Sequence, residues 1–124
     1  MEIKKELLYT NDHEWVKDLG DGTYHIGITD YAQDKIGDIS FIELPEVDAT
    51  FLAQEVFGTI ESFKAASDVY APFEFTVLDT NTDLEDEPEK INESPYDAWL
   101  IKVSPEDISG LLSSEYYEKL TEGE

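Results

Sequence analysis

Short stretches in which polar and apolar residues alternate recur along most of the chain, a pattern typical of strands with one buried face. The predicted strands lie at residues 13–17, 24–28, 38–44, 56–61, 68–71, 74–79 and 98–103. In the third of these, Ile39, Phe41 and Ile42 are predicted to pack inward. Because the strands are short and joined by tight turns, the fold class is predicted to be mainly β, a sandwich or small barrel and not a parallel sheet.

A short helix is predicted near residues 30–36. Thr29 and Asp30 can cap its start, and Gly37 is well placed to end it. Residues 81–90 are polar and acidic, so they are predicted to form a loop or a partly helical excursion.

Near the C-terminus, the spacing of the apolar residues changes from that of a strand to that of a helix. Ser104 is a residue type common at the N-cap of a helix, and Pro105 is common at the first helical position. Apolar residues then follow at helical spacing, namely Ile108, Leu111, Leu112, Tyr116 and Leu120. They predict a helical segment over about residues 105–120, either one helix with a break near Gly110 or two short ones.

The composition bounds the fold and disfavours several kinds of partner. The chain has 124 residues, 40% of them hydrophobic, which fits a single domain over residues 1–124. Thirty acidic residues against 8 basic ones give a formal charge of −22, so binding to nucleic acid or to anionic membranes is disfavoured. The charge serves solubility, steering toward basic partner proteins, or both. Without an apolar targeting or spanning segment, we expect a cytoplasmic protein, or one of the mitochondrial matrix if the source is eukaryotic. We also expect a monomer.

No self-contained active site or metal site is predicted. The chain lacks cysteine and has neither a glycine-rich dinucleotide motif nor a Walker pattern. His13 and His25 fall on separate predicted strands and lack the spacing of a zinc protease. Residues 79–83 begin like a calcium loop, but Leu84 and Lys90 stand where Gly and Glu are needed. We therefore expect no catalytic residue, no metal ligand and no enzymatic activity of the chain alone.

Lys64 stands out in so acidic a chain, because it lies between two predicted strands at or near the tip of a hairpin. It could be an ordinary surface lysine, a catalytic lysine, or the attachment point of a swinging cofactor. Catalysis would require burial to lower the pKa of the lysine, and a hairpin tip is a poor place for that. The small neighbours Ala65, Ala66 and Ser67 leave the ammonium accessible to a modifying enzyme, as attachment requires.

Five blocks of the sequence resemble the H protein of the glycine cleavage system, a family of lipoyl carriers. The blocks are residues 11–16 (NDHEWV), 27–34 (GITDYAQD), 37–47 (GDISFIELPEV), 58–68 (GTIESFKAASD) and 91–96 (INESPY), the last accompanied by Trp99. They occur in the order of the family, and the resemblance runs from about Leu8 to Leu120.

The resemblance implies a fold, a cofactor and partners. The fold would be a barrel-sandwich hybrid of two small antiparallel sheets, and Lys64 would carry lipoate in amide linkage. This arm would take the aminomethyl group of glycine from the P protein, the decarboxylating glycine dehydrogenase, to the T protein, an aminomethyltransferase. The L protein, dihydrolipoyl dehydrogenase, would reoxidise the dithiol. A lipoate ligase, or a lipoyl or octanoyl transferase, would attach the group.

Glu14 and Asp68 lie in matching blocks, which makes them candidates for lining a cleft in which the loaded arm rests. A protonated amine in a cleft needs a carboxylate beside it. The alternatives are a surface strand position for Glu14 and a turn cap for Asp68.

The chain departs from the family pattern at several positions. Phe63 precedes the lysine where Val is usual, and Asp48 and Phe75 replace common glycines in predicted turns. The usual Lys-Gly is absent from residues 52–55, and residues 96–99 are one residue shorter than usual. Since glycine permits positive φ, we expect altered turn geometry, with more effect on partner recognition than on the fold.

Three other functions remain open beside the carrier. The first is an H-like relay that supplies lipoyl groups to other lipoyl-dependent enzymes. The second is a biotin carrier, although such carriers usually flank the lysine with methionine and none is near Lys64. The third is an unmodified acidic interaction module.

Overall fold

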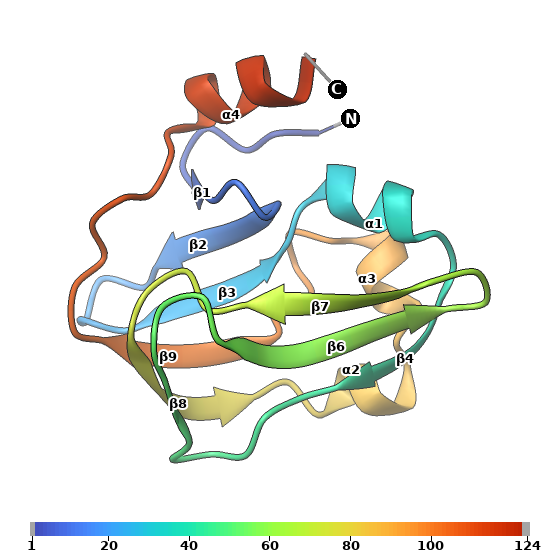
Figure 1. Ribbon diagram of the computed structural model, residues 1–124, viewed down its shortest axis with the longest axis horizontal. Coiled ribbons are helices and arrows are strands. Elements are labelled where there is room, and N and C mark those ends of the chain that lie inside the picture. Colours follow the sequence, from blue (N-terminus) through green and yellow to red (C-terminus); the bar gives the residue numbers. More distant parts are fainter. Residues whose placement is uncertain (1, 123–124) are drawn as a thin grey trace.

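Two antiparallel sheets form the body of the protein, with the helices at their margins (Figure 1). The computed structural model describes residues 2–122. In spatial order, the six-stranded sheet contains β1 (Leu8–Tyr9), β2 (Glu14–Asp18), β3 (Tyr24–Ile28), β9 (Ile101–Pro105), β8 (Phe75–Thr80) and β5 (Thr50–Phe51). The three-stranded sheet contains β4 (Ile39–Glu43), β6 (Val56–Ser62) and β7 (Ala66–Tyr70). The predicted barrel-sandwich class is confirmed.

The main core lies between the two sheets. Side chains from both sheets are fully buried there, for example Ile26, Val77 and Val103 from the larger sheet and Ile60 from the smaller one. A second cluster of Leu7, Tyr9, Trp15 and Tyr117 lies where α4 (Ser114–Glu122) covers the N-terminal segment. None of the helices within residues 2–122 is long and apolar enough to cross a membrane.

The first helix forms as predicted. It is α1 (Asp30–Ile36), and the side chain of Thr29 accepts a hydrogen bond from the backbone N–H of Ala32 at 3.2 Å. Gly37 ends the helix with a φ of 89°, a conformation that favours glycine. The acidic excursion is partly helical, with α2 (Asp83–Asp86) and α3 (Lys90–Glu93).

The predicted start of the C-terminal helix is wrong. Ser104 and Pro105 belong to β9, where Pro105 lies opposite Phe75 of β8. The ladder with β3 ends at Val103, so Pro105 needs no N–H on that side. The chain then runs as an irregular segment, and the helix begins at Ser114.

One aromatic side chain, that of Phe41, lies differently from the prediction. Phe41 is 49% exposed, because an irregularity between Ile39 and Phe41 turns Ile42 inward in its place. Phe75, which replaces a glycine common in the family, is a buried residue of β8 and agrees with the strand predicted over residues 74–79. Asp48 lies in a turn with a φ of 76°, so this turn has the positive φ that favours glycine although no glycine is present.

Candidate functional site

The hairpin of β6 and β7 presents Lys64 at its tip. The last cross-strand pair is Glu61 with Ala66, and the N–H of Ser62 donates to the carbonyl of Ala65 at 2.8 Å. The hydroxyl of Ser62 accepts the N–H groups of Lys64 at 3.3 Å and Ala65 at 3.2 Å. The turn between β6 and β7 (Figure 1) is therefore held by its own hydrogen bonds. Lys64 is an exposed residue of this turn.

A hollow of about 290 Å³ lies beside the tip and is lined by Gly37, Asp38, Ser62, Phe63 and Lys64. The stem of Lys64 lies against Gly37, so closely that a Cβ added to Gly37 would lie 2.8 Å from Cε of Lys64. Gly37 thus has two roles, since it ends α1 and leaves room for the lysine. Only the first of these roles, the end of α1, was predicted from the sequence.

Asn92 of α3 fixes the backbone beneath this hollow. Its Nδ2 donates to the carbonyl of Gly37 at 2.9 Å and to Oε1 of Gln33 at 2.8 Å. Its Oδ1 accepts the N–H of Ile39 at 2.9 Å. The role of Asn92 was not predicted, because it bonds residues more than fifty positions away in the chain.

Glu14 is buried and does not occupy the exposed strand position that was one alternative, since only 1% of it is exposed. Its Oε1 accepts the hydroxyl of Thr10 at 3.1 Å, and its Oε2 accepts the N–H of Tyr70 at 2.9 Å. Burial raises the pKa of Glu14 to about 8, and the neighbouring carboxylate of Asp12 adds to the shift, while both hydrogen bonds oppose it. The carboxyl is therefore largely protonated at neutral pH.

Asp68 is exposed and lies within β7, so it is not a turn cap. The hydroxyl of Thr59 on the paired strand donates to it at 3.4 Å. Asp68 is two residues before Tyr70, whose N–H binds Glu14. The fold therefore places the carboxyl of Glu14 against β7, the strand that also carries Asp68. Along this strand, the contact with Glu14 at Tyr70 is about 7 Å from Asp68. Lys64 lies in the turn before this strand, two residues before β7 begins.

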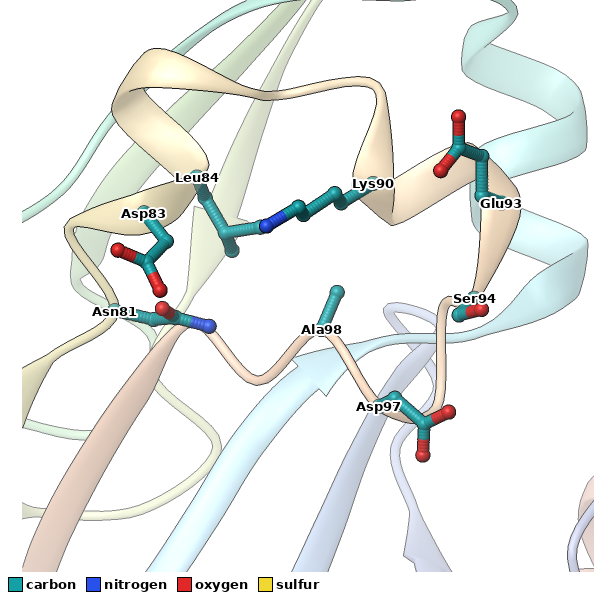
Figure 2. A pocket seen from close by; sticks show the side chains of 8 residues that line it. All are labelled: Asn81, Asp83, Leu84, Lys90, Glu93, Ser94, Asp97 and Ala98. Carbon is teal, nitrogen blue, oxygen red and sulfur yellow. The ribbon is translucent and has the colours of Figure 1, made fainter.

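A second hollow of about 350 Å³ lies between α2, α3 and the segment that leads into β9 (Figure 2). Lys90 extends across it from α3, and its ammonium forms an ion pair with Glu87 at 3.1 Å. Asn81 donates to the carbonyl of Trp99 at 2.9 Å, so its amide is part of the framework. Within residues 2–122, no group of three or more acidic or histidine side chains is placed to hold a metal ion.

Comparisons with known proteins agree with this geometry. The family described as Glycine cleavage H-protein matches residues 7–124. The glycine cleavage system H protein of Geobacillus kaustophilus is 52% identical over 124 residues, which cover 97% of each chain. That of Listeria welshimeri is 54% identical over 123 residues, which cover 96% of this chain and 98% of the relative. The crystal structure of a glycine cleavage system H protein from Mycobacterium marinum superimposes with a TM-score of 0.91 at 36% identity, covering 97% of this chain and 99% of that one.

Proposed function

Because the chain belongs to the glycine cleavage H-protein family, we propose that Lys64 is the residue to which its lipoyl group is attached. The protein is the carrier subunit of the glycine cleavage system and not itself a catalyst. The observation that carries the assignment of Lys64 is its exposure at the tip of an ordered hairpin, with a hollow beside its stem. The whole chain then acts as one lipoyl-binding domain.

Attachment is an acyl transfer to the ε-amino group of Lys64. The deprotonated Nζ attacks the activated carboxyl carbon of lipoate, an amide bond forms, and the activating group leaves as the nitrogen loses its second proton. A lipoate ligase, or a lipoyl or octanoyl transferase, supplies the activated acyl group. Once bound to Lys64, the group would supply a dithiolane whose S–S bond opens as it takes up a one-carbon amine on one sulfur and two electrons.

The H-protein family implies that the chain works with the P, T and L proteins of the system. A tether raises the effective concentration of the carried group at each partner, so separate enzymes exchange it over a short range. We propose that the carrier acts as a cytoplasmic monomer.

Glu14 and Asp68 are proposed to receive the amine of the loaded arm when it folds back along β7. Glu14 lies buried against this strand, where a carboxylate would interact strongly with a cation, and Asp68 adds an exposed carboxylate on the same strand. Arrival of the cation would favour loss of the proton from Glu14.

Mass spectrometry tests the assignment of Lys64. Incubation with a lipoate ligase, ATP and lipoate should add one lipoyl-sized increment, and peptide mapping should place it on Lys64. Lys64→Arg should abolish both the increment and glycine cleavage while the circular dichroism spectrum stays unchanged. Lys119→Arg, a change on the distant helix α4, is the matched control and should be modified like the wild type. An increment on another lysine would refute the assignment.

The relay of lipoyl groups to other enzymes is not favoured, because the matching family and relatives are those of the glycine cleavage carrier. Deleting the gene separates the two roles, because a relay would be needed for lipoylation of other enzymes. Loss of glycine oxidation alone supports the carrier.

A further inference from the structure

Phe63, which immediately precedes Lys64, is 90% exposed. The other large apolar side chains at the surface are less exposed, for example Leu52 and Tyr116, each of which is 59% exposed. Single exposed apolar residues are ordinary in proteins, so exposure alone does not imply function. The position of Phe63 carries the inference.

Any enzyme that modifies Lys64 must also cover Phe63. Consecutive Cα atoms are only about 3.8 Å apart. The turn that carries both residues is fixed by the hydroxyl of Ser62. Phe63 also lines the hollow in which the stem of Lys64 lies. When the ε-amino group enters an active site, the ring of Phe63 is therefore brought against the rim of that site.

The surroundings of Phe63 define the chemistry of the surface that would accept it. Glu61 and Asp68 are exposed on the two strands of the hairpin, and Phe41 is 49% exposed on β4 opposite Glu61. The hairpin thus offers one projecting aromatic ring and a set of carboxylates. A complementary surface has an apolar recess bordered by lysine or arginine side chains.

We propose that Phe63 is the anchor by which the enzyme that attaches the lipoyl group recognises this carrier, and that its ring enters an apolar recess with a basic border beside that enzyme's active site. The inference rests on the proposed attachment at Lys64. Transfer of a phenylalanine ring from water to an apolar recess is among the larger contributions that a single side chain makes to binding.

Lipoylation kinetics test the anchor. The unmodified protein is the substrate, and the enzyme is the purified lipoate ligase of the organism that encodes the chain, with ATP and lipoate. Phe63→Ser is expected to lower kcat/KM by about tenfold or more, mainly through a higher KM for the carrier. Phe63→Leu should recover most of the loss, because the recess needs an apolar group. Leu52→Ser is the matched control, because it also removes an exposed apolar side chain, but one beyond the end of β6 that is remote from Lys64. Its kcat/KM should equal that of the wild type.

The outcomes separate the anchor from the attachment site. A kcat/KM for Phe63→Ser within twofold of the wild type, with Lys64 still modified, would overturn the anchor and leave the proposed function standing. A loss confined to kcat would also overturn it, because the ring would then position the lysine without binding the enzyme. Failure of the wild type to be modified at all would overturn both. Urea melts of each variant check that the fold is intact, and a rise of KM with salt is expected from the basic border.

Discussion

Glu14 links the buried part of the site to the stability of the protein. The pKa of this carboxyl is raised to about 8 by burial, so between about pH 4.5 and 8 the folded protein holds a proton that the unfolded chain releases. The free energy of unfolding should therefore fall as pH rises through this window, by up to about 1.4 kcal/mol per pH unit from this group.

Glu14→Gln isolates that effect. The amide still offers an oxygen to the N–H of Tyr70 but cannot titrate. Urea denaturation at a series of pH values should show a shallower decline for the variant than for the wild type between about pH 4.5 and 8. Parallel curves would mean that Glu14 titrates as an ordinary surface carboxyl.

Gln54 is held in a backbone conformation that suits glycine, with φ 73°. Its N–H donates to the carbonyl of Ala71 at 2.7 Å, so the turn cannot relax easily. Gln54→Gly should raise the free energy of unfolding by up to about 1 kcal/mol, because relief of left-handed strain exceeds the added entropy of the unfolded chain.

Ala53→Gly is the matched control for this change. Ala53 is not among the residues with positive φ in the described chain, so glycine there brings only the entropic cost. Thermal melts of the two variants should shift in opposite directions. A loss of stability in Gln54→Gly would show that the side chain contributes more than the strain.

Asn92 joins three elements, so it should contribute more to the stability of the fold than an exposed polar residue does. Its amide bonds α1, the Gly37 cap and the start of β4. Asn92→Ala should lower the free energy of unfolding by about 2–3 kcal/mol, because partly buried backbone groups lose their partners. Asn11→Ala, at an exposed position, is the control and should change stability little.

The sequence predicted individual elements where the signal is local. Thr29 and Gly37 mark the ends of α1, and the pattern around Lys64 marks a hairpin. The late start of α4 was missed because Ser104 and Pro105 have the residue types of a helix cap, while pairing with β8 decides their conformation. Strands β1 and β5 have two residues each, too few for any period to show.

Long-range contacts set the limit of what could be predicted about the site. Lys64 could be found from its own neighbourhood, and the family resemblance placed it in a fold. The burial of Glu14 depends on Tyr70, fifty-six residues away, and the hollow beside Lys64 depends on Gly37. The residues next to Glu14 in the sequence give no indication that strand β7 covers it.

The net charge of −22 acts on the molecule as a whole. Among residues 2–122, the ion pairs Lys4–Glu2 and Lys90–Glu87 are solvent-exposed and stabilise the fold little. Repulsion among carboxylates should therefore dominate the response to salt, since the screening length falls from about 30 Å at 0.01 M to about 10 Å at 0.1 M. The urea midpoint should rise over this range, and a fall would show that favourable ion pairs outweigh the repulsion.

The turn that Ser62 closes also bears on how one lysine is selected among eight. A free peptide covering residues 56–70 has the same side chains, but on binding it would lose about 1–2 kcal/mol of conformational free energy for each residue that becomes ordered. In the folded protein that ordering is complete before the enzyme arrives. Selection of Lys64 therefore depends on a prearranged shape, and the isolated peptide should be a poor substrate despite its identical sequence.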